Sequence, residues 1–135
     1  MEGKIDMVCI VDDDDIYRLV ASIEIKKTEM VNNIIVFPDG QKAISYFIVQ
    51  KENLEKLPDI IFLDINMPVM DGWQFLEEYM LIKSVLPKSI VIYMVSSSVD
   101  YRDITRAKNI SEVSGYLVKP IGKQRLLEVF KELIK

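Results

Sequence analysis

The residues best suited to chemistry are the four consecutive aspartates Asp12–Asp15, which follow the apolar run Met7–Val11. Neighbouring carboxylates repel by about 1 kcal/mol in water, and by about 4 kcal/mol where the effective dielectric constant is near 20. A solvated turn needs only one or two acids. We interpret Asp14 and Asp15 as N-cap residues of a following helix, whose free backbone N–H groups a carboxylate can satisfy. Asp12 and Asp13 then predict a positive group nearby.

Three further apolar runs also end in polar residues: Asp64 after Ile60–Leu63, Ser96, Ser97 and Ser98 after Ile90–Val95, and Lys119 after Tyr116–Val118. Taken singly, each has an ordinary explanation as a cap, a loop residue or a surface lysine, and we assign Asp71 to such a cap. Those separate explanations do not account for acidic, hydroxyl and lysine side chains all occurring directly after apolar runs. Carboxylate and hydroxyl oxygens suit Mg²⁺, with Mn²⁺ as an alternative, and Mg²⁺ favours a phosphate beside it.

Five short apolar runs predict the strands that would position these groups: Met7–Val11, Ile34–Phe37, Ile60–Leu63, Ile90–Val95 and Tyr116–Val118. The runs lack alternation between apolar and polar residues, so we expect strands that are buried on both faces, as in a parallel sheet. The second run is followed only by an ordinary turn sequence, Pro38-Asp39-Gly40.

Between the runs, apolar residues recur at helical spacing: Ile16, Leu19, Val20 and Ile23; Ala43, Ile44, Phe47 and Ile48; Phe75, Leu76, Tyr79 and Met80; and Leu126, Leu127, Phe130, Leu133 and Ile134. Residues 100–109 form a weaker pattern, which predicts a helix poorly anchored to the core. Residues 50–56 indicate either a longer second helix or its exit loop. The alternation predicts a doubly wound α/β domain over residues 1–135, with five helices and right-handed crossovers. Ligands of such folds bind at the carboxyl ends of the strands.

Composition narrows the function classes. The chain has 135 residues, 50% of them hydrophobic, and a net charge of −4, which fits one domain with a sizeable core. We see no basic stripe for nucleic acid, no apolar run near the ~20 residues of a membrane span, and a start too polar for a signal peptide. We therefore expect a cytoplasmic protein, with Cys9 as a buried apolar residue. The absence of histidine excludes Ser-His-Asp catalysis and histidine-ligated zinc.

This constellation resembles the receiver domain of bacterial response regulators, the CheY-like family, over essentially the whole chain. The family pattern falls on Asp12 and Asp13, on Asp64 as phosphoacceptor, on Ser96, and on Lys119 with Pro120. The segment DINMPVMDG is a highly specific form of the loop after the phosphoacceptor. The resemblance implies strand order 2-1-3-4-5.

The resemblance also implies roles for further residues. The backbone carbonyl of Asn66 would ligate Mg²⁺ beside the three carboxylates, and Lys119–Pro120 would be a cis peptide. The small residue Ser97 would leave room for the phosphoryl group, and Lys119 would bind it. Ser96 would move toward the phosphoryl group, which would let Tyr116 turn inward as the switch residue.

In function, the resemblance implies a single-domain response regulator of a two-component phosphorelay rather than an enzyme. Because the chain has no histidine, the phosphohistidine donor must be another protein, a histidine kinase or a histidine phosphotransfer protein. The sequence stops just after the last predicted helix, so we expect output by contact with a target protein. A monomer and a phosphorylation-dependent dimer both remain open.

Two other classes fit parts of the sequence. A haloacid-dehalogenase-like phosphatase also uses Asp and Mg²⁺, and its Asp-x-Asp occurs within residues 12–15. That interpretation leaves Asp64 without a role and expects Ser or Thr where Pro38 stands. A flavodoxin-like FMN carrier needs a phosphate-binding loop after the first strand, where four acids would repel the phosphate.

Overall fold

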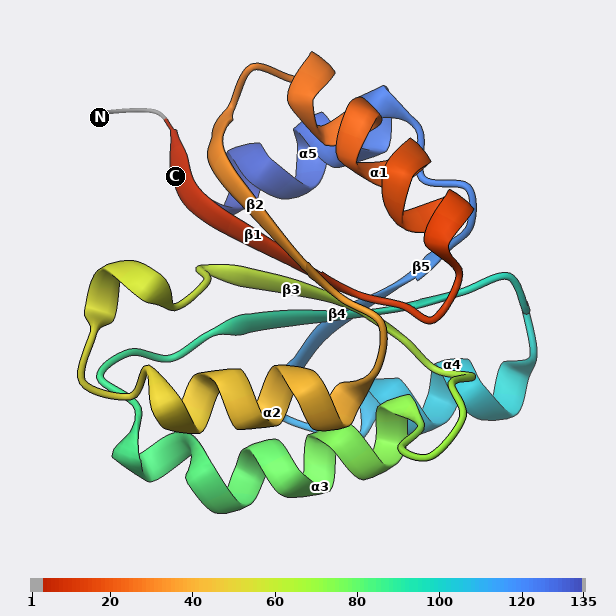
Figure 1. Cartoon of the computed structure of the whole chain (residues 1–135). Helices are drawn as coiled ribbons and strands as arrows, with labels where there is room; N and C mark the ends of the chain where they lie inside the picture. Colours follow the sequence, from red (N-terminus) through yellow and green to blue (C-terminus); the bar gives the residue numbers. More distant parts are fainter. Residues whose placement is uncertain (1–3, 135) are drawn as a thin grey trace.

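The predicted apolar runs form a five-stranded parallel sheet in the computed structural model, which describes residues 4–134 (Figure 1). The strands are β1 (Ile5–Val11), β2 (Val31–Phe37), β3 (Ile60–Asp64), β4 (Val91–Ser96) and β5 (Val113–Val118). Their order, β2-β1-β3-β4-β5, confirms the predicted fold. The ends of the predicted domain, residues 1–3 and 135, lie outside the described residues.

The prediction that every strand is buried on both faces is wrong for the two edges of the sheet. All five residues of β3 are buried, whereas β2 and β5 have exposed residues such as Asn32, Asn33 and Ser114. Edge strands contact only one neighbour, so they tolerate polar side chains. For the same reason β2 and β5 begin earlier than their apolar runs suggest.

Five helices cover the two faces of the sheet: α1 (Asp15–Lys27), α2 (Gly40–Val49), α3 (Gly72–Ile82), α4 (Tyr101–Lys108) and α5 (Lys123–Leu133). Helices α1 and α5 lie on one face, and α2, α3 and α4 lie on the other (Figure 1). The exit-loop alternative for residues 50–56 is confirmed, because α2 ends at Val49 and only the short 3₁₀ helix Leu54–Lys56 follows. No helix within residues 4–134 is long and apolar enough to cross a membrane.

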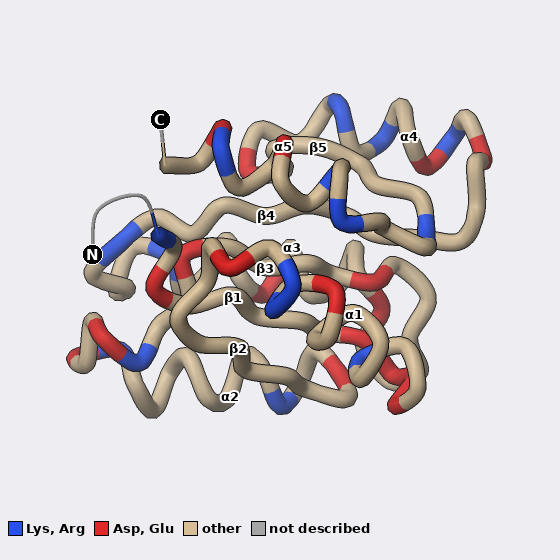
Figure 2. Tube along the Cα trace, turned by 90° about the horizontal axis from the view of Figure 1, so that it is seen from above, with Lys and Arg blue, Asp and Glu red and all other residues tan. Residues whose placement is uncertain are grey.

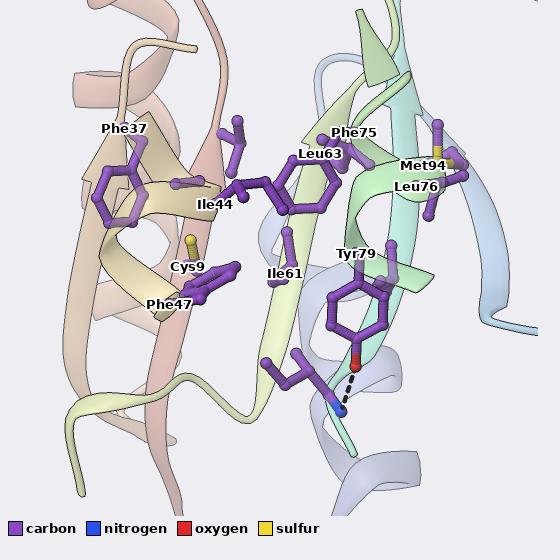
Figure 3. Packing of buried hydrophobic residues seen from close by; sticks show 14 of the residues in the cluster. Cys9, Phe37, Ile44, Phe47, Ile61, Leu63, Phe75, Leu76, Tyr79 and Met94 are labelled. Atoms are coloured by element: carbon purple, nitrogen blue, oxygen red, sulfur yellow. Dashed lines mark hydrogen bonds between the residues drawn. The ribbon is translucent and has the colours of Figure 1, made fainter. Parts of the chain in front are cut away.

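The larger core cluster packs between the sheet and the α2–α3 side (Figure 3). Phe47 and Phe75 are fully buried and meet edge to face, with their ring centroids 6.4 Å apart. The Tyr79 hydroxyl accepts a hydrogen bond from the backbone N–H of Ile90 at 3.3 Å. Cys9 is fully buried, as predicted. Burying a phenylalanine contributes about 1.5–3 kcal/mol, so these contacts fix the sheet that carries the site.

Helix α4 is weakly anchored, as predicted, since Ala107 is its only buried residue. A second contact comes from Arg106, whose guanidinium lies 4.3 Å from the centroid of the Trp73 ring in α3. A helix with so few buried contacts can shift at low cost in free energy.

Helix α1 departs from the expected amphipathic pattern. The predicted apolar residues Ile16, Leu19, Val20 and Ile23 are all exposed, by 71%, 62%, 49% and 45%. Residues spaced four apart face the sheet instead: Tyr17, Ala21 and Ile25, of which Ile25 is 1% exposed. The helix has two apolar faces, and spacing alone does not say which one meets the sheet. We call the exposed set Ile16, Leu19, Val20 and Ile23 the α1 stripe.

Candidate functional site

Three carboxylates meet at the carboxyl edge of the sheet. Asp12 follows β1 and Asp64 ends β3. One oxygen from each of Asp12, Asp13 and Asp64 lies within 4.8 Å of the others. Asp12 and Asp64 are 1% and 5% exposed, while Asp13 faces solvent. Figure 2 shows acidic residues gathered at this end of the molecule, beside α1.

Local hydrogen bonds hold the acidic run in place. The Asp14 carboxylate accepts hydrogen bonds from the N–H groups of Ile16 and Tyr17, which confirms it as the N-cap of α1. Asp15 lies in the first turn, where a negative charge favours the helix dipole, rather than at the cap. Asp12 Oδ1 accepts from the N–H of Asp14 at 2.9 Å. Only Asp12 and Asp13 therefore face the site.

Lys119 provides the positive group that the acidic run predicts. Its Nζ lies 2.7 Å from Asp12 Oδ2 and 3.5 Å from Asp64 Oδ1, and its side chain is 18% exposed. The Lys119 N–H donates to the carbonyl of Ser96 at 2.9 Å, and the following Lys119–Pro120 peptide is cis. The ammonium thus lies between the two buried acids.

The ammonium leaves one oxygen incompletely satisfied. Within residues 4–134, Asp12 Oδ2 is buried and accepts no hydrogen bond, and its ion-pair partner is the ammonium of Lys119 at 2.7 Å. The distance establishes an ion pair, and one ammonium group leaves a lone pair of this oxygen for a further ligand. A buried carboxylate oxygen in this state suits a metal ion.

Burial and charge shift the protonation of the site. Burial, with a further contribution from the Asp12 carboxylate, raises the pKa of Asp64 to about 6, and Lys119 opposes this shift. Burial by itself would lower the pKa of Lys119, but its contacts with Asp12 and Asp64 outweigh burial and raise that pKa. At neutral pH the site therefore contains a cation and a carboxylate that is costly to ionise.

Serines at the end of β4 form another side of the site. Ser96 is 1% exposed, and its Oγ accepts a hydrogen bond from the Ser98 N–H at 3.0 Å. Ser97 is exposed. The Tyr116 hydroxyl donates to the Ser98 carbonyl at 2.8 Å, so the residue predicted to switch is attached to this loop.

The loop from β3 to α3 approaches Asp64 closely. Asn66 is exposed there. Asp71 caps α3 and exchanges hydrogen bonds with Gln74 in a capping box, which confirms the predicted cap. A Cβ on Gly72 would lie 2.6 Å from the carbonyl oxygen of Asp64. Gly72 is thus needed for the approach of α3 to the end of β3.

Two contacts at the site were not predicted from the sequence. The Tyr17 ring centroid lies 4.2 Å from Lys119 Nζ, and Arg18 donates to the Asp12 carbonyl at 2.7 Å. Tyr17 lies in the first turn of α1, directly after the acidic run. The sequence holds no signal for its contact with a lysine from β5.

Comparison with known proteins identifies the family. Residues 8–131 match the family model described as "Response regulator receiver domain". The chain belongs to this family. It is 31% identical over 125 residues to protein PilG of Pseudomonas aeruginosa, covering 92% of this chain and 84% of PilG. It is 27% identical over 126 residues to the two-component response regulator ORR1 of rice (Oryza sativa subsp. japonica), covering 90% of this chain but only 53% of ORR1.

A solved structure supports the same family. A two-component response regulator from Cytophaga hutchinsonii superimposes with a TM-score of 0.88 at 29% identity, covering 97% of this chain and 98% of that one. Receiver domains act as phosphoacceptor switches in phosphorelay signalling. Membership of this family favours the receiver over the phosphatase and FMN-carrier alternatives.

Proposed function

We propose that this receiver domain accepts a phosphoryl group on Asp64 from a phosphohistidine of another protein, in a reaction that depends on Mg²⁺. The observation that carries the proposal is the meeting of Asp12, Asp13 and Asp64 within 4.8 Å at one sheet edge, with Lys119 between the two buried acids. Such a site can hold a dication and a phosphoryl group together.

The donor set fits Mg²⁺ or Mn²⁺. It consists of carboxylate oxygens, and Asp12 Oδ2 is buried with no hydrogen bond of its own. Asp13 and Asp64 would hold the ion with Asp12 and the Asn66 carbonyl. The bound ion would supply positive charge that stabilises the attacking and transferred oxygens.

The chemical step uses residues of this chain. An Asp64 carboxylate oxygen attacks phosphorus, an O–P bond forms, and the P–N bond breaks with its electron pair staying on the donor imidazole. Lys119 and the Ser96 hydroxyl then donate hydrogen bonds to phosphoryl oxygens, and exposed Ser97 leaves space for the group. The pKa of Asp64, which burial and Asp12 raise to about 6 against the opposing effect of Lys119, still lies below neutral pH, so most of the nucleophile is ionised.

The signal would leave through α4 and β5. When Ser96 turns toward the phosphoryl group, its hydrogen bond with Ser98 is lost, and with it the support for the Tyr116 contact. Tyr116 is then free to turn inward. Helix α4 can follow because Ala107 is its only buried residue, which presents a changed surface to a target protein.

The phosphodonor would dock on the α1 stripe. The stripe begins directly after the acidic run, so a helix packed on it lies beside Asp64. Its residues are 45–71% exposed, and an apolar cavity of about 230 Å³ adjoins it between α1 and α5. Leu19→Lys should therefore slow transfer from autophosphorylated histidine kinases but leave the reaction with acetyl phosphate unchanged. Leu81→Lys on α3, also exposed, is the matched control.

Intact mass spectrometry after treatment with acetyl phosphate tests the proposal. We expect one added phosphoryl group on the wild type with Mg²⁺, none after chelation, and none on Asp64→Asn. Asp13→Asn should need much more Mg²⁺ for the same yield. Equal modification with and without Mg²⁺, or of Asp64→Asn at wild-type yield, would contradict the proposal.

A further inference from the structure

The ammonium of Lys119 has an aromatic neighbour as well as two acids. The centroid of the Tyr17 ring lies 4.2 Å from Lys119 Nζ. Asp12 Oδ2 and Asp64 Oδ1 lie 2.7 Å and 3.5 Å from the same atom. Tyr17 is held by α1 and packs with Ala21 against the core cluster on the α1–α5 side. The ring is therefore a fixed surface beside a flexible side chain.

A lysine head group is strongly hydrated and moves on a stem of four rotatable carbons. An aromatic face attracts such a cation, and the attraction changes an equilibrium by about 3-fold to 30-fold. Unlike a third carboxylate, a ring face adds no negative charge. It therefore holds the ammonium without competing for the metal or repelling a phosphoryl group.

We infer that Tyr17 is a positioning residue for Lys119, whose ammonium its ring face holds between Asp12 and Asp64, ready to pair with phosphoryl oxygens. The inference rests on the proposed function, in which Lys119 binds the phosphoryl group. It assigns the action to the ring face rather than to the hydroxyl group.

The matched variants are Tyr17→Phe, which keeps the ring face, and Tyr17→Leu, which keeps apolar bulk without it. We expect the affinity for fluoroberyllate, a phosphoryl mimic, to fall by about 3-fold to 30-fold in Tyr17→Leu at saturating Mg²⁺. It should stay within 2-fold of wild type in Tyr17→Phe. Affinity for Mg²⁺ alone should not fall in either variant. Neither change strengthens the ion pair between Lys119 and Asp12, which competes with the metal for that carboxylate. Titration calorimetry measures both constants.

Wild-type affinity for fluoroberyllate in Tyr17→Leu would overturn the inference. So would an equal loss in Tyr17→Phe, which would assign the effect to the hydroxyl group. A parallel loss of Mg²⁺ and fluoroberyllate binding would also overturn it, by indicating general damage to the site. The proposed function fails by a different result, namely that the wild type itself accepts no phosphoryl group. The two failures are therefore distinguishable.

A spectroscopic test needs no change at Tyr17 and so does not depend on its variants folding. A ring face near the ammonium shifts the Lys119 ε-methylene protons upfield of those of other lysines in a ¹³C–¹H correlation spectrum. The resonance is assigned by its loss in Lys119→Arg. We expect the upfield shift in the wild type. A Lys119 resonance at the usual lysine position in wild type would overturn the inference.

Discussion

Removal of the Asp64 charge should make the metal-free protein more stable. The pKa of Asp64 is raised from 3.8 to about 6 by burial and by Asp12, and each pKa unit corresponds to about 1.4 kcal/mol. The ionised carboxylate therefore costs up to about 3 kcal/mol, which screening at the open side of the site reduces to about 2 kcal/mol. For a domain of this size, that is an increase in melting temperature of about 6 °C in Asp64→Asn.

The pH dependence gives the sign of the effect. The folded-state pKa of Asp64 is raised, so the folded protein binds a proton more tightly than the unfolded chain. The wild type therefore gains stability relative to Asp64→Asn as the pH falls from about 6 toward 3.8, and the difference should nearly vanish at about pH 4. Mg²⁺ should also reduce the difference, because it stabilises the charged site of the wild type.

Urea unfolding, followed by the fluorescence of Trp73 in the presence of a chelator, provides the assay. Asp6→Asn is the matched control, because Asp6 is exposed and far along the strand from the site. It should change the free energy of unfolding by less than about 0.5 kcal/mol. A metal-free Asp64→Asn protein no more stable than wild type at neutral pH would refute the reasoning. So would a gain in stability at about pH 4 that equals the gain at neutral pH.

Three further outcomes are expected. Gly72→Ala should lose about 1–3 kcal/mol of stability and accept phosphoryl groups more slowly, because its Cβ would lie 2.6 Å from the Asp64 carbonyl. Gly122→Ala, where the space is open, is the control, and equal effects would be contradictory. Lys119→Ala should bind Mg²⁺ at least as tightly, yet show less change in hydrogen exchange at α4 with fluoroberyllate; a full wild-type change would contradict this. Asp71→Ala should cost about 1 kcal/mol in urea unfolding through the lost cap, and an unchanged midpoint would argue against it.

The sequence predicted correctly those features in which a buried strand ends in a polar residue suited to chemistry. A buried run such as Ile60–Leu63 indicates a strand of a parallel sheet, and polar residues that end parallel strands meet at one sheet edge. That reasoning brought Asp12, Asp64 and Lys119 together correctly. The caps Asp14 and Asp71 were also predictable, since capping depends on local hydrogen bonds.

Features that depend on packing between distant segments were not predictable. The α1 stripe has the spacing of a core face, yet the helix is turned so that Tyr17 and Ile25 meet the sheet, because both faces carry apolar residues. The contact of Tyr17 with Lys119 joins segments about a hundred residues apart. The edge strands β2 and β5 extend through polar residues because solvent covers one side of each.

The most direct test of the central claim is to locate the acyl phosphate. Borohydride reduces an aspartyl phosphate to homoserine, which peptide mass spectrometry can place in the chain. After treatment with acetyl phosphate and Mg²⁺, the account predicts homoserine at position 64 and at no other aspartate. Homoserine at Asp12 or Asp13, or a stable phosphate on Ser96, would contradict it.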